Sequence, residues 1–586
     1  MKAAHKILKI IIAVLMLTLG NQVKAQEQGY QWSKWYQGQR PGTASQDRIY
    51  TTIADDEGNC YVFGKFGKEA RLGGLDAPYI CPMDTISDYS YLVGNSIGIF
   101  LAKIDSAGNV LWHKWARNGS ENSACLPWNM VVKDNLITIA FDNTFGSEFW
   151  NWFYCFDTML IEPNTIWGQD RPGVKTTYFV TFDLNGNRQK YHFIQQYGSD
   201  SPNLLSIRTE RFGFGRGRFS IDDENSIHIC TSGELSYKDS LHQPYLIIDG
   251  ESNKTYPLIA ACSIDSYAIK SSSAYYKIDS TWNLVESKPL VRNIESNHNS
   301  QYVNECNLTF NDVSCFDSMI FVCGTMSNES IFRIEDSLGG IPFQGRVYLD
   351  SVHSLKIENL RDFTFKPFLF QMNNHGEIKW LQQPYSDSPD DILRNYYSHT
   401  PLAIDDSNVY FHFNSSFVSS LGWGITNDNH IFLDSLHTIQ INNRLRPYSV
   451  IVAYDRFSGD YRQYWLIDTL ERHKNNTLVI CDSILIVDPN FNGGFNSSSV
   501  LCKVNKNTQN IINCFPIRED NSENNCLAIS NSGYILRAHQ ASRSFVDDSI
   551  FVGNYSEAAV MTFYYDSSLD LRRRPCPQVD SLWGSI

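Results

Sequence analysis

The alternation of apolar and polar positions along this chain repeats one motif: an apolar stretch, a turn rich in Asp, Asn and Gly, and a second apolar stretch. Its clearest copy runs from Phe100 to Trp112. Apolar runs rich in β-branched and aromatic residues on either side of such turns are typical of β-hairpins. Weaker copies begin at Tyr178, Ala274, Phe368, Val450, Val500 and Ala559.

A second element, a short turn followed by an apolar strand, precedes each hairpin. Its copies begin at Asp55, Lys133, Asp222, Cys315, Asp405, Cys481 and Ser530. The two elements alternate strictly, so the chain reads as repeats of a four-stranded unit with an insert of variable length inside each. In β-propellers, such units are arranged as blades around a central axis and leave few strand edges exposed. We therefore predict an all-β fold, a single seven-bladed β-propeller with long inter-strand inserts, spanning residues 26–586.

The inserts and the chain ends refine this prediction. Inserts at fixed points of a repeat normally form loops on one face. Two of them contain similar segments, 347–355 and 431–439, which we expect at the outer part of a blade. Segment 31–36 resembles the closing strand at 110–115, so the N-terminal segment is one candidate to complete the last unit. Segment 569–571 is the other, and the sequence does not decide between them.

Segment 56–64, followed by 100–112, resembles the repeat of secreted bacterial β-propeller proteins, roughly D-x-x-G-N-x-Y-V-x-G … F-x-x-K-Y-D-x-x-G-x-x-x-W. The resemblance covers most of the chain after residue 25, closely in the first unit and weakly in the third, sixth and seventh. It implies an extracytoplasmic propeller, usually without assigned catalysis. Many relatives carry a C-terminal β-sandwich sorting domain, which we expect to be absent because Ile586 follows soon after the seventh unit.

Residues 1–25 have the pattern of a secretory signal peptide. Basic residues Lys2, Lys6 and Lys9 precede an apolar run at 10–19, and small residues occupy positions just before Gln26. We predict cleavage there and export to the periplasm or the extracellular space. No later stretch is long and apolar enough for an integral membrane segment. The net charge of −14 argues against nucleic acid as a partner, and its simplest role is solubility.

The 14 cysteines form no C-x-x-C pair, so neither a zinc ribbon nor a thioredoxin-like site is predicted. Many, such as Cys230 and Cys323, lie within apolar strands, where a free cysteine behaves as a small buried hydrophobe. Cys502 and Cys514 differ because they flank the turn at 505–510 almost symmetrically. This spacing predicts a cross-strand disulfide between them.

Motifs that usually carry catalysis occur here in the wrong context. The G-x-S-x-G string at 94–98 runs directly into a strand, although a hydrolase elbow needs a following helix. The acidic turn at 55–59 lacks the twelve-residue calcium-loop spacing, so turn formation explains it better. His228 and His412 occupy equivalent strand positions, which favours structural roles. We predict no catalytic residue, no metal and no cofactor.

The candidate ligand-binding residues lie in inserts and loops. The glycine-rich loop at 213–218 also precedes a strand, which argues against a nucleotide, but Arg216 and Arg218 are candidates for contacting an anion. Trp150, Trp152 and Trp423 lie in inserts, and exposed aromatic rings suit carbohydrate stacking or protein contacts. The alternative is that these aromatic side chains pack an insert against the propeller.

The sequence therefore favours an exported, non-catalytic binding or scaffold protein that engages a protein or glycan through inserts on one face. One alternative is a propeller enzyme, a glycan hydrolase or lyase, with carboxylates from separate blades at the central channel. A second alternative is a structural subunit of a cell-envelope complex. The ligand, the oligomeric state and the choice between periplasm and cell exterior are not encoded in any motif.

Overall fold

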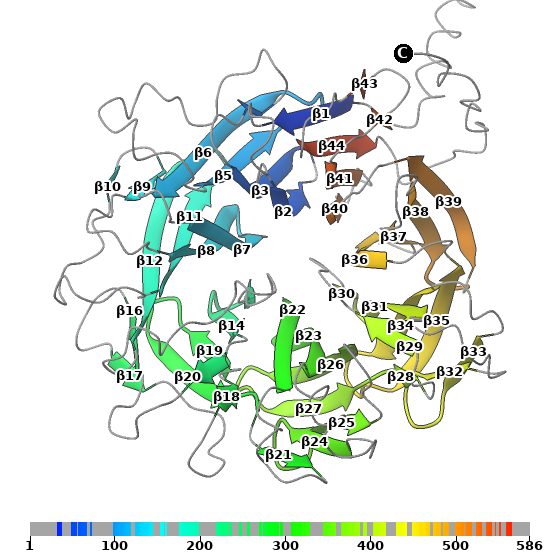
Figure 1. Cartoon of the computed structure of the whole chain (residues 1–586). Helices are drawn as coiled ribbons and strands as arrows, with labels where there is room; N and C mark the ends of the chain where they lie inside the picture. The colour runs from blue at the N-terminus through cyan, green and yellow to red at the C-terminus, as the bar shows by residue number, and fades with distance from the viewer. Residues whose placement is uncertain are drawn as a thin grey trace, which may run out of the picture.

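The computed structural model is all-β and propeller-like, with antiparallel sheets that follow one another around a common centre (Figure 1). It describes strands and their turns between residues 32 and 564. The longer segments outside the described residues are 1–31, 73–97, 161–174, 198–217, 329–343 and 565–586. Within the described part, every regular element is a strand, as the hydrophobic pattern predicted.

Each repeat forms four strands that pair in chain order. Sheet one contains β2 (Arg48–Ala54), β3 (Cys60–Phe66), β5 (Gly98–Ile104) and β6 (Val110–Asn118). Sheet two contains β7 (Ala124–Lys133), β8 (Leu136–Thr144), β11 (Lys175–Asp183) and β12 (Arg188–Tyr197). Sheet three contains β13 (Arg218–Ile221), β14 (Ile227–Thr231), β19 (Ala274–Ile278) and β20 (Leu284–Pro289).

The later repeats follow the same order. Sheet four contains β22 (Cys306–Phe316), β23 (Met319–Asn328), β26 (Phe365–Asn373) and β27 (Ile378–Gln382). In sheet five, β29 (Asp391–Arg394) and β30 (Leu402–Ile404) both pair with β31 (Asn408–Phe417), followed by β34 (Tyr448–Asp455) and β35 (Tyr461–Asp468). Sheet six contains β36 (His473–Cys481), β37 (Ile484–Phe491), β38 (Ser498–Asn505) and β39 (Ile511–Arg518).

Strands from both halves of the chain form the last sheet. Sheet seven contains β40 (Glu523–Ile529), β41 (Ile535–Ala541) and β44 (Ala558–Tyr564), and β1 (Trp32–Gln37) pairs antiparallel with β44. The register runs from Trp32 opposite Phe563 to Gln37 opposite Ala558. Of the two sequence candidates for this strand, the N-terminal segment forms it; segment 569–571 lies outside the described residues.

Three inserts contribute strands that pair with the outer strand of the preceding sheet, and two more pair with the segment that follows that sheet in the chain; we call these five the edge hairpins. Strand β4 (Arg71–Leu72) pairs with β1, β9 (Phe153–Cys155) with β6, and β16 (Tyr245–Ile248) with β12; β10 (Met159–Leu160) and β17 (Thr255–Pro257) complete the second and third. Strands β24 (Gln344–Tyr348) and β25 (Ser354–Glu358) extend from β21 (Asn293–Ser296), and β32 (Asn429–Phe432) and β33 (Thr438–Ile441) extend from β28 (Tyr385–Ser386). Two short pairs remain: β15 (Glu234–Ser236) with β18 (Ile269–Ser271), and β42 (Phe545–Val546) with β43 (Ile550–Phe551).

The two similar segments predicted at the outer part of a blade, 347–355 and 431–439, form the tips of the last two edge hairpins. They pair with β21 and β28, which follow the fourth strands β20 and β27 in the chain. In Figure 1, β24 and β25 lie outside β27 of sheet four, and β32 and β33 lie outside the strands of sheet five. Their place in the fold is therefore the one predicted.

The apolar core consists of clusters that join each sheet to the next. Tyr61 and Leu101 of sheet one pack with Ile139 and Tyr178 of sheet two, and similar clusters join sheets two to six in sequence. Burial of these apolar side chains supplies the main force that holds neighbouring sheets together.

The tryptophan of the repeat adds a directed link between sheets. The indole Nε1 of Trp112 donates to the Leu184 carbonyl at 3.2 Å, Trp380 to Arg456 at 3.2 Å, and Trp465 to Asn505 at 3.1 Å. Each acceptor lies in the turn between the third and fourth strands of the next sheet. Trp112 and Trp380 occupy equivalent positions of the repeat and fasten their sheets to the following ones. Trp465 lies two residues farther along its strand, and Gln463 takes the equivalent position and donates to the Lys506 carbonyl.

Candidate functional site

Antiparallel pairing gives every sheet two different ends. The turn from the first to the second strand and the turn from the third to the fourth lie at one end, which we call the turn end. The connection from the second to the third strand, and the connection to the next sheet, leave from the other, the insert end. All of the long inserts within the sheets therefore start and finish at the insert end.

The acidic residues at the turn end hold the turns themselves. Asp183 Oδ1 accepts hydrogen bonds from the backbone amides of Asn185 and Asn187, both at 2.9 Å, and its Oδ2 accepts one from Asn187 Nδ2 at 2.9 Å. The bonds from Asn187 lower the pKa of Asp183. Asp105 and Asn373 make the same pair of backbone contacts in their turns. Turn formation thus accounts for these acids, as predicted. The described residues hold no group of His, Cys, Asp or Glu suited to a metal ion.

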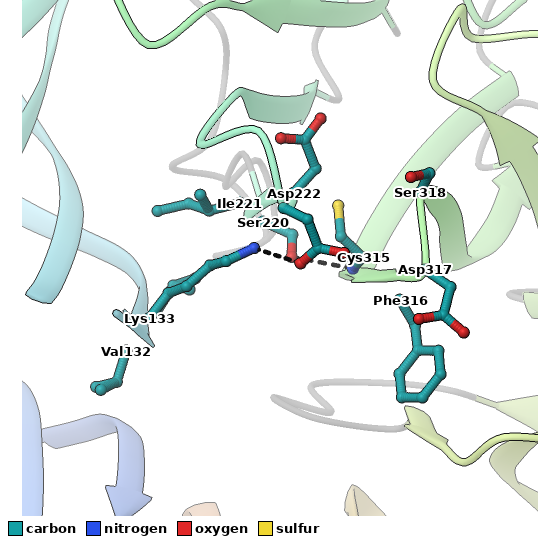
Figure 2. A pocket seen from close by; sticks show the side chains of 11 residues that line it. Val132, Lys133, Ser220, Ile221, Asp222, Cys315, Phe316, Asp317 and Ser318 are labelled. Carbon is teal, nitrogen blue, oxygen red and sulfur yellow. Dashed lines mark hydrogen bonds and ion pairs between the residues drawn. The ribbon is translucent and has the colours of Figure 1, made fainter. Parts of the chain in front are cut away.

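A cavity of about 210 Å³ lies at the turn end, among sheets two, three and four (Figure 2). Three equivalent turns line it, those that follow β7, β13 and β22. Across it, Lys133 Nζ lies 2.7 Å from Asp223 Oδ1. On another side, the backbone amide of Cys315 donates to Ser220 Oγ at 3.0 Å. Polar groups from three sheets thus already interact around this cavity.

Behind the cavity, a buried chain of hydrogen bonds starts at Asp222. His228 Nε2 lies 2.8 Å from Asp222 Oδ2, and His228 Nδ1 lies 2.8 Å from the Tyr275 hydroxyl. Burial lowers the pKa of His228, although Asp222 opposes this effect, and the lowered pKa favours the neutral imidazole. A neutral ring with this pair of neighbours donates from Nε2 to the carboxylate and accepts the hydroxyl proton at Nδ1. The ring has no nitrogen left for proton transfer in the cavity.

The remaining acid on the cavity wall is also engaged. Asp317 Oδ2 lies 2.9 Å from Arg456 Nη1 of sheet five. The guanidinium carbon lies 4.8 Å from the ring centroid of Phe316 and 4.6 Å from that of Phe457. These contacts join sheets four and five, so Asp317 serves an inter-sheet contact.

Arg218, a predicted anion-binding residue, is buried between sheets. Its Nη1 donates to the Trp128 carbonyl of sheet two at 2.6 Å. Burial raises the pKa of Asp312 in sheet four to about 7, and the nearby Arg218 charge opposes that rise. The contacts of Arg218 thus connect three sheets, and it does not line the cavity. Binding of an anion by Arg218 remains a prediction, and its neighbour Arg216 lies outside the described residues.

The three tryptophans predicted to bind a ligand, Trp150, Trp152 and Trp423, also lie outside the described residues. The end of the aromatic run, however, is anchored. Tyr154 of β9 is opposite Arg117 of β6, and Phe156 is buried with its amide donating to the Trp115 carbonyl at 2.9 Å. The second insert is therefore fixed to sheet one directly after Trp152.

The cysteines and the second histidine take structural positions. Cys230 and Cys323 are free and fully buried within their strands, as predicted. Cys502 is disulfide-bonded, and the register places Cys514 directly opposite it; that these two residues form the bond remains a prediction. His412 is fully buried, with Nε2 against Ser449 Oγ.

Sequence reasoning did not identify the cavity. Lys133, Asp222 and Cys315 begin the second, third and fourth copies of one repeat element, so the signal was their equivalence. The sequence does not show that these turns lie close together in space.

No helix in the part of the chain that the structure describes is long and apolar enough to cross a membrane. No family model matches the chain, and no curated protein matches it. Among solved structures, a polysaccharide lyase, the ulvan lyase of family PL25, is 8% identical with a TM-score of 0.37, covering 92% of this chain and 96% of its own. A europium-containing methanol dehydrogenase is 9% identical with a TM-score of 0.32, covering 90% and 95%. A sialidase from Streptococcus pneumoniae is 10% identical with a TM-score of 0.31, covering 92% and 70%. At these values the likenesses carry no inference about function.

Proposed function

We propose that this chain is an exported, non-catalytic binding or scaffold protein, whose seven sheets form a seven-bladed β-propeller and whose inserts engage a protein or glycan. Pairing of β1 with β44 supports a closed ring, because it joins the first and last described strands of the chain in one sheet. The signal-like segment 1–25 supports export to the periplasm or the extracellular space. The repeat motif supports membership of the secreted bacterial β-propeller proteins.

The observation that carries the proposal is the difference between the two ends of the sheets. At the turn end, the acidic side chains are already committed to turns and to contacts between sheets. At the insert end, long segments leave the sheets, and edge hairpins fix several of them to the neighbouring sheet. Anchored loops on a rigid frame lose little conformational freedom on binding, which favours recognition there.

The second insert is the best-placed binding element. Trp152 directly precedes Phe153, the first residue of the anchored strand β9. An indole at such a position suits stacking against a sugar ring or insertion into a protein pocket. We infer that Trp150 and Trp152 contact the ligand and that Trp423 contributes from the fifth insert.

A glycan hydrolase or lyase is the main alternative. The hydrolase among these alternatives requires a carboxylic acid with a raised pKa beside a second carboxylate. Hydrogen bonds from His228 and the Ser226 amide outweigh the effect of burial and lower the pKa of Asp222. Asp312 has a raised pKa, but its neighbour is the Arg218 guanidinium and it does not line the cavity. The described residues therefore favour binding over this chemistry.

A glycan array and capture from envelope extracts, each probed with the mature chain, test the proposal. We expect one class of ligand to be retained, and Trp150→Ala or Trp152→Ala to reduce that binding at least about tenfold. Phe457→Ala is the matched control, because Phe457 is an exposed aromatic residue at the turn end. Loss of binding in Phe457→Ala with full binding in both tryptophan variants would place the ligand at the turn end and overturn the proposal. Turnover of a captured glycan would favour the enzyme instead.

A further inference from the structure

The two similar edge hairpins, β24–β25 and β32–β33, share their inward side chains and differ in their outward ones. The inward side chains are aliphatic and buried: Val347, Leu349, Leu355, Ile431, Leu433 and Ile439. Side chains alternate along a strand, so the residues between them point outward. At two equivalent outward positions, the first hairpin carries Arg346 and Lys356 and the second carries His430 and Gln440. The hairpin itself therefore does not require cations there.

Arg346 and Lys356 form an unusual pair. The register places them directly opposite each other on β24 and β25, and both are exposed. Like charges in this arrangement destabilise antiparallel strands. Arg346 Nη1 donates to Ser354 Oγ at 3.4 Å, and no carboxylate of the described residues forms an ion pair with either cation. On a chain with a net charge of −14, this spot is locally positive and suits an anionic ligand.

A side-chain amide connects this cation pair to the next edge hairpin. Gln383 Oε1 accepts a hydrogen bond from the Lys356 amide at 2.7 Å, and Gln383 Nε2 donates to the Lys356 carbonyl at 3.1 Å. Gln383 lies two residues before Tyr385, the first residue of β28. Figure 1 shows β28 between β25 and β32 on the outer side of sheets four and five. The two edge hairpins thus form one continuous outer surface.

The second half of this surface is aromatic. Tyr385 is opposite Phe432, and their rings stack with centroids 4.6 Å apart and planes within 4° of parallel. Phe432 lies between two inward residues of β32 and its neighbouring turn, so its ring points outward, and both rings are partly exposed. A cation pair and an aromatic pair therefore lie side by side. We call Arg346, Lys356, Tyr385 and Phe432 the outer strip.

We propose that the outer strip binds an acidic glycan, a polysaccharide whose sugars carry carboxylate or sulfate groups. The planar guanidinium of Arg346 suits a bidentate contact with either oxyanion, and Lys356 supplies a second charge beside it. The aromatic rings pack against the apolar face of a sugar. The strip belongs to the fourth and fifth inserts, so this inference rests on the proposed function and names the class of its ligand.

Titration calorimetry of the mature chain tests the proposal with a hexamer of galacturonate, which has a carboxylate on every sugar, against neutral maltohexaose. Dextran sulfate and unsulfated dextran form the second pair of probes, for a sulfate ligand. We expect one acidic probe to bind at least about tenfold more tightly than its neutral counterpart. This preference should fall when sodium chloride rises from about 0.05 M to about 0.5 M, because salt screens exposed charges.

The variants separate the two halves of the strip. Arg346→Gln and Lys356→Gln should each raise the dissociation constant for the acidic probe about tenfold, and the double variant should abolish most of the salt dependence. Phe432→Leu should weaken binding several-fold and leave the salt dependence unchanged. Glu295→Gln should strengthen binding, because the register places this acid opposite Arg346. Circular dichroism of each variant confirms that it is folded.

The matched control is Lys379→Gln, because Lys379 is a half-exposed lysine at the turn end of sheet four; binding should not change. Acidic probes that bind no better than neutral ones overturn the inference. Tight binding that survives in Arg346→Gln/Lys356→Gln overturns it too. If the same binding is lost in Trp150→Ala and Trp152→Ala, the proposed function stands without this inference. Loss in the strip variants alone supports the strip and removes the second insert from the proposed function.

Discussion

The link between Trp380 and Gly459 should show strong energetic coupling across the boundary of sheets four and five. Gly459 has a φ of +75°, and a Cβ atom added there would lie 2.6 Å from Trp380 Cδ2 and 2.7 Å from Cγ. Replacing Gly459 by Ala thus combines two costs. A positive φ in a non-glycine residue costs about 1–2 kcal/mol. Overpacking against a buried indole adds about 1–3 kcal/mol.

A double-mutant cycle separates the two costs. Gly459→Ala in the wild-type chain should lower the free energy of unfolding by the sum, about 2–5 kcal/mol. In a Trp380→Ala background the indole is gone, so only the backbone term of about 1–2 kcal/mol remains. The coupling energy is therefore expected to be about 1–3 kcal/mol, well above the error of additivity.

Urea unfolding followed by far-ultraviolet circular dichroism measures this coupling, because the signal does not depend on the tryptophan that is removed. The slope of the transition should stay constant while its midpoint moves. The same cycle at Trp112 and Gly186 provides a repeat, since a Cβ on Gly186 would lie 2.8 Å from Trp112 Cδ2 at a φ of +82°. Equal costs of Gly459→Ala in both backgrounds, within about 0.5 kcal/mol, would refute the steric explanation.

Three further predictions concern titration and the disulfide. Partial burial raises the pKa of Asp455, but the hydrogen bonds from Arg462 and from turn amides outweigh this effect and hold the pKa at about 2. The stability that the Asp455 carboxylate contributes is present above about pH 4 and is lost as the pH falls toward 2. Asp455→Asn should therefore flatten this part of the stability profile. Burial raises the pKa of Asp312 to about 7, so the free energy of unfolding should decline as the pH rises from about 4 to about 7. If Asp312→Asn shows the same decline, the decline belongs to another titratable group. Mass spectrometry after alkylation without reductant should leave Cys502 and Cys514 unmodified and joined in one peptide pair, whereas alkylation of both would exclude the bond.

The repeated hairpins could be located from the sequence because each carries local signals that agree. Around Asp105, for example, apolar strands flank an Asp–Ser–Ala–Gly–Asn turn, and Gly108 adopts the positive φ that the turn requires. Local sequence and local structure give the same answer there. The all-β class and the order of strands within each sheet follow from those signals.

The pairing partners of the edge hairpins and the cavity could not be found in this way. Strand β9 pairs with β6 across some forty residues of chain, and no residue in either strand encodes that choice of partner. The cavity needs Lys133 and Asp223, ninety positions apart, at a distance of 2.7 Å. Such contacts depend on how sheets pack, which sequence periodicity does not report. Arg218 illustrates the same limit, because its loop-like sequence gave no sign of its burial.

The edge hairpins also bear on how such a chain changes during evolution. A gene duplication or deletion that follows the sequence repeat moves a sheet together with the hairpin that covers its predecessor. A new unit inserted after sheet one would therefore have to supply a strand that fits β6, and would itself rely on the β9 hairpin for its own edge. Units that recombine freely must share compatible edges. This requirement keeps neighbouring repeats matched to each other even where their individual sequences have diverged.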